Sequence, residues 1–100
     1  FLEINKAEYL GDYRIRLWFN NDEVRDVDLS GSLKGEAFRP LMDKDYFKCF
    51  SIRFNTIEWE NGADFAPEYL YEIGAALDVF VVLPNQPFVT RSSLHEASTF

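Results

Sequence analysis

The only histidine of the chain, His95, lies close in sequence to two serines. A histidine that takes a proton from Ser92 or Ser93 would suit a hydrolase with a covalent intermediate. Such an enzyme also needs an acid that orients the histidine and donors for the oxyanion, and we can assign neither in this C-terminal stretch. We therefore interpret His95 as an ordinary surface residue.

The single cysteine, Cys49, lies between Lys48 and Phe50. A neighbouring lysine can favour the reactive thiolate, but a small thiol in a phenylalanine-rich neighbourhood is usually part of a core. We expect Cys49 to be buried. One cysteine cannot form an internal disulfide. One cysteine and one histidine are also too few ligands for a zinc or other transition-metal site within a single chain, so we expect none.

Carboxylates form three groups that would suit a calcium site or acid–base catalysis. The groups are Asp22, Glu23, Asp26 and Asp28; Asp43 and Asp45; and Glu58, Glu60, Asp64 and Glu68. Asp43-Lys44-Asp45 lacks the glycine that follows in a calcium-binding loop. We interpret all three groups as solvated faces and helix-terminal charges, and we predict no metal, no cofactor and no enzymatic activity.

Arg14, Arg16 and Trp18 fall on one side of an alternating segment. Two cations and an aromatic ring on one sheet face can bind single-stranded nucleic acid. Acidic residues are expected opposite the arginines on the next strand. We therefore predict that the arginines are paired within the domain and that the chain does not bind nucleic acid directly.

The chain of 100 residues has 10 basic and 17 acidic residues and a net charge of −7. This charge repels nucleic acid and anionic membranes, and it favours solubility or a basic partner. The longest apolar run, Val79 to Leu83, has only the length of a strand, and we find no signal peptide. We expect a cytoplasmic protein.

Three strands are predicted at the N-terminus. Residues 2–10 form the first and end at a turn at Gly11-Asp12. Period-two alternation over 13–19 indicates a half-buried second strand. A third strand carries Val27 and Leu29, and the three together form an antiparallel meander with one wet face.

The expected register of the second and third strands places Leu17 opposite Val27. Arg16 would then face Asp28, and Trp18 would face Asp26. Opposite charges directly across strands contribute up to about 1 kcal/mol.

The middle of the chain is predicted to contain short elements. Leu33 to Met42 forms a short helix or turn, because Pro40 disrupts a longer one. A single helical turn covers 43–47, with Asp43 as its N-cap. Residues 51–53 and 56–59 form a second hairpin around Asn55. The expected apolar anchors of this region are Phe47, Phe50, Ile52 and Phe54.

The segment from Trp59 to Tyr71 is the densest in structural signals. We expect Trp59 in the core, a turn at Asn61-Gly62 and a helix that starts at Pro67. We interpret the segment as structural, although its exposed polar groups leave a binding role open.

Charge and periodicity support the same helix. Asp64 and Glu68 place negative charge near its positive end. Apolar positions at i, i+3, i+4 and i+7 make it an amphipathic helix that lies on the sheet. These positions are Leu70, Ile73, Gly74 and Leu77.

The order of these motifs resembles a bacterial domain-of-unknown-function family, numbered 2442. The resemblance covers about residues 2–73 and rests on residues 13–19, Val27-Asp28-Leu29, 38–43 with Tyr46-Phe47, and 59–71. The motif residues of the last segment, which we interpret as mainly structural, are Trp59, Asn61, Gly62, Asp64, Pro67, Glu68, Leu70 and Tyr71.

The resemblance implies a small α+β fold, with a meander sheet and helices on one side, and no established activity. Some family members carry a helix-turn-helix domain after this one, and some short members are regarded as antitoxin components. We predict a single α+β domain over residues 1–77 and a C-terminal extension over 78–100, a strand plus tail that packs on the domain or on a neighbouring chain.

Three functional hypotheses follow. The first is a non-enzymatic interaction module, in its sharper form an antitoxin-like protein whose acidic surface and C-terminal extension bind a basic toxin or a second copy of the chain. The alternative is a regulatory domain that senses a small ligand in an apolar pocket near Trp59 or Trp18. An enzyme would require two carboxylates that converge in a cleft.

Overall fold

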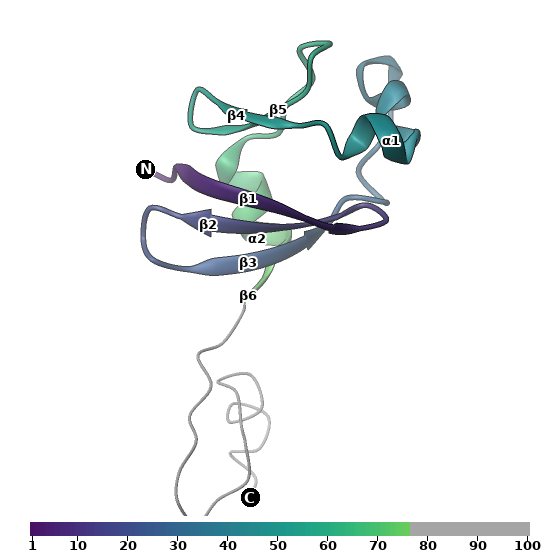
Figure 1. Ribbon diagram of the computed structural model, residues 1–100. Coiled ribbons are helices and arrows are strands. Elements are labelled where there is room, and N and C mark those ends of the chain that lie inside the picture. The colour runs from purple at the N-terminus through teal and green to yellow at the C-terminus, as the bar shows by residue number, and fades with distance from the viewer. Residues whose placement is uncertain (77–100) are drawn as a thin grey trace, which may run out of the picture.

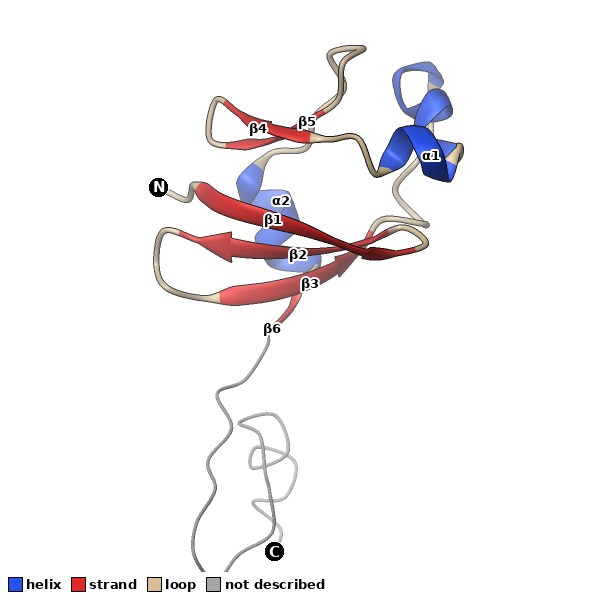
Figure 2. Cartoon of the chain, viewed as in Figure 1, coloured by secondary structure: helices blue, strands red, loops and turns tan. Residues whose placement is uncertain are grey.

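The structure, a computed structural model, describes residues 1–76. The predicted extension 78–100, with its strand over 79–83 and the residues Ser92, Ser93 and His95, lies outside the described residues, as does Leu77. The main sheet is antiparallel in the order β1-β2-β3-β6 (Figures 1 and 2), and its strands are β1 (Ile4–Gly11), β2 (Arg14–Phe19), β3 (Val24–Asp28) and β6 (Ala75–Ala76). This meander with short helices confirms the predicted α+β fold.

The two faces of the sheet differ as the period-two pattern predicts. Ile15, Leu17 and Phe19 of β2 are buried, whereas Arg14 is exposed and Trp18 is only partly covered. Alternate residues of a strand point to opposite faces, so one face belongs to the core and the other faces solvent.

The predicted register between β2 and β3 is wrong by two residues. Ile15, not Leu17, lies opposite Val27. Arg16 therefore faces Asp26 rather than Asp28, and Trp18 faces Val24 rather than Asp26. A shift of two residues keeps every side chain on its face, which is why the core assignment is unaffected.

The turn between these strands explains the difference. The Phe19 N–H donates to the Glu23 carbonyl at 2.8 Å, and the Asp22 N–H donates to the Phe19 carbonyl at 3.1 Å. Asp22 has a φ of 68°, in the left-handed region that aspartate tolerates better than most residues. Because this turn is tight, β2 and β3 begin to pair closer to it than they would across a longer loop.

Two short helices follow the meander. The first is the 3₁₀ helix η1 (Glu36–Met42), which contains Pro40 and buries Leu41. The second is α1 (Lys44–Phe47), whose N-cap Asp43 accepts a hydrogen bond from the Asp45 N–H at 3.0 Å. Both agree with the predicted short elements and with the predicted cap.

The second hairpin consists of β4 (Ser51–Arg53) and β5 (Thr56–Glu58), as predicted. Its turn residues, Phe54 and Asn55, have φ values of 50° and 74°. Two successive positive φ values characterise the type I′ turn that suits a two-residue hairpin. The Ile4 N–H donates to the Asn55 carbonyl at 2.9 Å, which holds the hairpin next to the start of β1 (Figure 1).

The prediction of four apolar anchors in this region is only half right. Phe47 is fully buried, and the Phe50 ring packs on the core. Ile52 is 39% exposed and Phe54 is 81% exposed. Both belong to a hairpin at the margin of the fold, where an apolar side chain has few neighbours to contact.

Helix α2 (Pro67–Ile73) begins at the predicted proline and ends earlier than the predicted period implies. Gly74 leaves the helix with an extended backbone, and Ala75–Ala76 pairs with β3. A Cβ on Gly74 would lie 2.9 Å from the Arg25 Cβ, so the close approach to β3 requires glycine. Ile73, expected on the buried side, is 39% exposed.

The core lies between the inner face of the main sheet, helix α2 and the second hairpin. Helix α2 lies behind the sheet in the view of Figure 1, and Leu70 is its fully buried residue. The fully buried side chains of the core are Trp59, Phe19, Phe47, Ile15, Leu17, Leu29, Leu41, Ile57, Leu70 and Val27.

Candidate functional site

Trp59 is a central core residue. Its side chain is 1% exposed, and its Nε1–H donates to the Phe47 carbonyl at 2.7 Å. The rings of Phe47, Phe50 and Phe65 lie 5.6, 6.1 and 6.0 Å from its ring, centroid to centroid. The indole therefore has its polar group satisfied and aromatic neighbours on several sides.

The turn at Asn61 and Gly62 joins three parts of the chain. The Asn61 Nδ2–H donates to the Ala37 carbonyl at 3.0 Å, and its Oδ1 accepts from the Ala63 N–H at 3.1 Å. Its backbone N–H donates to the Tyr46 hydroxyl at 3.0 Å. Gly62 has a φ of 88°, which favours glycine. Asn61 thus ties η1 and α1 to the end of the second hairpin.

The residues around the start of α2 also support the fold. Asp64 forms an isolated β-bridge with Glu58, which covers the far side of β5. Pro67 is the first residue of α2, where a missing N–H has no cost. Glu68 lies in the first turn, and Leu70 is buried.

Tyr71 connects α2 to β3 through a polar cluster. Its hydroxyl donates to Glu23 Oε2 at 2.5 Å, and the Arg25 guanidinium lies 3.7 Å from the centre of its ring. Arg25 also donates to the Tyr71 carbonyl at 2.8 Å and pairs with Glu23 at 2.9 Å. Arg25 therefore binds the last carbonyls of α2, where a cation is favoured.

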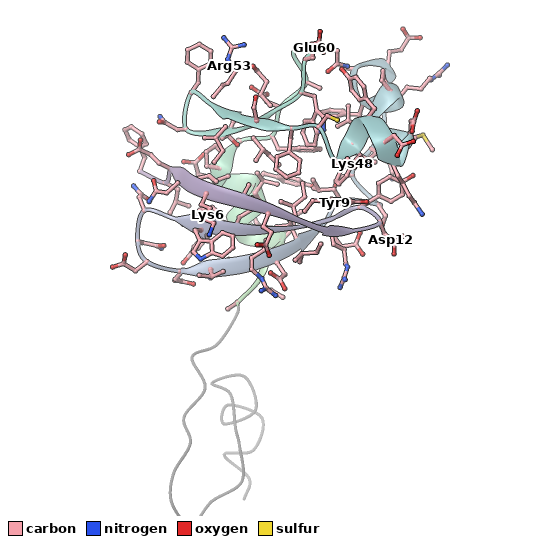
Figure 3. All side chains as sticks on the ribbon, in the orientation of Figure 1. Lys6, Tyr9, Asp12, Lys48, Arg53 and Glu60 are labelled. Carbon is pink, nitrogen blue, oxygen red and sulfur yellow. The ribbon has the colours of Figure 1, made fainter. Side chains whose placement is uncertain are left out.

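The outer face of the sheet pairs its own charges. Arg16 Nε and Nη2 donate to the two Asp26 carboxylate oxygens at 2.8 and 3.1 Å. This hydrogen bond raises the pKa of the Arg16 guanidinium. Figure 3 shows Lys6 on this face, and its Nζ lies 4.6 Å from the centre of the Trp18 ring. Arg16 and the Trp18 indole are thus engaged within the domain, whereas Arg14 lies opposite Asp28, is exposed and forms no ion pair within residues 1–76.

Cys49 is exposed, which contradicts the predicted buried thiol. Phe47 and Phe50 turn inward on either side of it, and its Sγ–H donates to the Asp45 carbonyl at 3.2 Å. Among residues 1–76, no group of three or more histidine, cysteine or acidic residues is arranged to hold a metal ion.

The exposed side of α2 carries an acidic and apolar strip that we call the α2 surface: Glu68, Tyr69, Glu72 and Ile73. Successive helical residues are about 100° apart, so these four side chains follow one another around one side of the helix. Within residues 1–76, neither glutamate of this surface makes an ion pair. Tyr69 is 40% exposed and stacks on Phe65 at 5.8 Å, and its hydroxyl lies 2.6 Å from Ser32 Oγ.

Only one residue of the α2 surface, Glu68, was a motif residue in the sequence. Glu72 and Tyr69 were missed, and Ile73 was assigned to the core. A detectable signal existed: Glu68 and Glu72 are spaced i, i+4 with no basic residue in the last turn of the helix. Like charges at this spacing repel each other and do not stabilise the helix.

Comparisons with known proteins place these residues in a family. Neither the curated proteins nor the solved structures gave a match. Among the described residues, no helix is long and apolar enough to cross a membrane. The model of the family described as "Protein of unknown function (DUF2442)" matches residues 4–76, from the first residue of β1 to the last of β6. The chain therefore belongs to this family.

Proposed function

We propose that the chain is a non-enzymatic interaction module, antitoxin-like in its action, that binds a basic protein through the α2 surface. The observation that carries this proposal is the combination, on one side of α2, of two glutamates without an ion pair among residues 1–76 and two half-exposed side chains, Tyr69 and Ile73. Glu68 and Glu72 repel each other in the isolated chain, and a cationic partner relieves this repulsion.

The apolar members of the α2 surface supply the second part of the argument. Tyr69 and Ile73 are partly exposed next to the glutamates. Tyrosine is common in interface cores because its ring offers a large contact area and its hydroxyl keeps a polar partner. A partner with arginine or lysine around an apolar contact is complementary to this surface in both charge and polarity. The net charge of −7 favours encounter with the same kind of partner.

The test is co-expression of the chain with the protein encoded beside its gene, followed by co-purification and measurement of affinity. We expect a complex whose affinity falls with added salt. The double substitution Glu68→Lys with Glu72→Lys should weaken it ten-fold or more, because it replaces attraction with repulsion.

Glu36→Lys provides the matched control for each single reversal, Glu68→Lys or Glu72→Lys, because Glu36 is an exposed acidic residue in the first turn of a different helix, η1. This substitution changes the net charge but leaves the α2 surface intact, so it should alter the affinity by much less. A neighbouring protein that does not bind, or binding that Glu36→Lys and the single reversals on α2 reduce equally, would contradict the proposal.

The alternative function, the sensing of a small ligand, requires an apolar pocket beside one of the tryptophans. Trp59 is surrounded by aromatic rings, and its N–H is donated to Phe47. Trp18 lies on the solvent-exposed face of the main sheet, next to the ammonium group of Lys6. These contacts support partner binding over ligand sensing as the leading proposal.

A further inference from the structure

The outer edge of β4 differs from the outer edge of β5, the second strand of the same hairpin. One side of β4 pairs with β5, and the far side of β5 is covered at Asp64. Within residues 1–76, no backbone hydrogen bond outside the hairpin reaches Ser51, Ile52 or Arg53, and all three side chains are exposed. An uncovered strand edge presents N–H and C=O groups to which another strand can pair.

The register of the hairpin determines which backbone groups point outward. Arg53 and Thr56 close the two-residue turn, and this closing pair is hydrogen-bonded in such a hairpin. Hydrogen-bonded and non-hydrogen-bonded pairs alternate along an antiparallel ladder. The next pair, Ile52 and Ile57, is therefore of the non-bonded kind, and the Ile52 N–H and C=O point away from β5.

The residues along this edge are self-complementary. The segment Phe50-Ser51-Ile52-Arg53-Phe54 has an apolar residue at its centre and a phenylalanine at each end. If two copies pair antiparallel about a two-fold axis at Ile52, each Ile52 exchanges both backbone hydrogen bonds with its counterpart. Each Arg53 then lies opposite Ser51 of the second copy, and each Phe54, in the turn just beyond the end of the ladder, lies near Phe50 of the second copy. Aromatic cross-strand pairs are favourable, and no like charges face each other.

Charge also favours a second copy at this edge over other faces. The chain as a whole has a net charge of −7, so most faces of two copies repel each other. Residues 50–54 contain one arginine and no carboxylate. Arg53 reaches Glu58 of its own hairpin at 3.5 Å, and Figure 3 shows it at the margin of the fold. Two copies can approach there with little of the repulsion that opposes contact elsewhere.

Phe54 combines an unfavourable backbone conformation with high exposure, and its contacts within one copy do not account for either. Its φ of 50° is a conformation that bulky residues rarely adopt, and glycine or asparagine is preferred at this position of a type I′ turn. Phe54 is 81% exposed, and the Arg53 guanidinium lies 5.4 Å from the centre of its ring. A strained, exposed aromatic residue contributes to neither the turn nor the core, and such outliers are found at functional contacts.

We propose that β4 is a self-association edge, at which a second copy of the chain pairs its own β4 antiparallel about a two-fold axis at Ile52. The result is a four-stranded β5-β4-β4-β5 sheet across the dimer, with Phe54 of each copy next to Phe50 of the other. This surface is separate from the α2 surface, so a dimer can form whether or not a basic partner binds.

The first experiment measures the molar mass of the full chain in solution over a range of concentrations. We expect a concentration-dependent dimer. Of the backbone hydrogen-bonding groups, Ile52→Pro removes only the outward N–H of β4 and keeps the ladder to β5, so it should weaken dimerisation ten-fold or more. Phe54→Asn, which suits the turn, should weaken it as well while the chain stays folded. Ile73→Asn, on the α2 surface, is the matched control and should leave the dimer unchanged.

The second experiment tests the register by oxidation in a Cys49→Ser background. In a hydrogen-bonded antiparallel pair the Cα atoms are about 5.5 Å apart, so Ile52→Cys should form a disulfide between copies. Arg53→Cys should not, because the two copies of this residue are separated beyond the disulfide limit of about 7 Å. A chain that is monomeric at all concentrations would overturn the proposal. A dimer that survives both Ile52→Pro and Phe54→Asn, or equal cross-linking at both positions, would overturn it too.

Discussion

The segment from Trp59 to Tyr71 and the segment from Phe50 to Phe54 contain similar kinds of side chain and use them in opposite ways. In the first, Trp59 donates to Phe47, Asn61 joins three parts of the chain and Tyr71 donates to Glu23. In the second, Phe54 is exposed at a strained φ, and the outer edge of β4 makes no backbone hydrogen bond within residues 1–76.

This difference distinguishes most of the residues that identify the family from those that are available for contact; Glu68 belongs to both sets. Residues whose donors, acceptors and rings are all engaged internally hold the fold together, and they have little left to offer a partner. Within residues 1–76, the backbone edge of β4 and the glutamates on the exposed side of α2, Glu68 of the first segment among them, keep groups without such a partner. The densest motif of a sequence is therefore a guide to the fold, and surfaces that the fold leaves open are a better guide to binding.

The largest effect is expected from Trp59→Ala. The change removes a fully buried side chain and its hydrogen bond, and a truncation of this kind destabilises a core by about 3–5 kcal/mol. Domains are usually stable by only about 5–15 kcal/mol, so the variant should be partly unfolded or close to it. Urea denaturation followed by circular dichroism measures the change.

Trp18→Ala is the matched control, because Trp18 lies on the wet face and is partly exposed. This substitution should lower the free energy of unfolding much less than Trp59→Ala does. Equal losses of stability for the two tryptophan variants would show that the segment from Trp59 to Tyr71 is no more important to the fold than the outer face of the sheet.

The next largest effect is expected from Asn61→Ala. Two side-chain hydrogen bonds, to Ala37 and from Ala63, are lost. At about 0.5–1.5 kcal/mol each, the free energy of unfolding should fall by about 2 kcal/mol.

Asn55→Gly is the comparison at the end of the other segment, in the turn that follows Phe54. The φ of Asn55 is 74°, so glycine fits and stability should change little or rise. A loss of stability for Asn55→Gly as large as that for Asn61→Ala would contradict the distinction between the two segments.

The features of the fold that depend on neighbouring residues could be predicted from the sequence. Local signals predicted correctly the buried face of β2, the cap at Asp43, the hairpin around Asn55 and the start of α2 at Pro67. Each depends on residues within a few positions of one another, where alternation and turn chemistry act directly.

The errors concern contacts between distant segments. A two-residue change of register leaves the same side chains inward, so alternation could not distinguish Ile15 from Leu17 as the partner of Val27. The end of α2 depends on the approach of Gly74 to Arg25. The exposure of Ile52 and Phe54 depends on the position of β4 at an edge, which hydrophobicity does not reveal.

A smaller effect of opposite sign is expected from Phe54→Asn. Asparagine adopts the left-handed region more readily than phenylalanine, and the strain of a bulky residue there is about 1 kcal/mol. At concentrations where the chain is monomeric, the variant should be more stable than the parent by about 0.5–1 kcal/mol. Thermal unfolding at low concentration measures this. Phe50→Asn should be destabilising, since Phe50 packs on Trp59, and a loss of stability for both variants would mean that Phe54 supports the monomer.

The smallest effect concerns Asp28, which forms after β3 the same kind of turn that Asn61 forms after β5. Its Oδ1 accepts from the Ser30 N–H at 2.9 Å, two residues on, just as Asn61 Oδ1 accepts from Ala63. Asp28 can ionise, so pH reports on the strength of such a turn. The Ser30 N–H, then the Ser30 hydroxyl and the Arg14 guanidinium, hold the pKa of the Asp28 carboxyl below its usual range.

A pKa lowered by folding means that the charged carboxylate is favoured in the folded chain. Its contribution is complete above the pKa of the unfolded chain and is lost as pH falls through the lower pKa of the folded chain. Asp28→Asn keeps an acceptor but not the charge, so the parent should be the more stable at pH 7, and its advantage should shrink as the pH falls below about 4. Because Asp28 is exposed, the advantage at pH 7 should be below about 1 kcal/mol. Urea midpoints of both chains at several pH values test this, and an advantage that grows in acid would show that the Asp28 turn is not held by its charge.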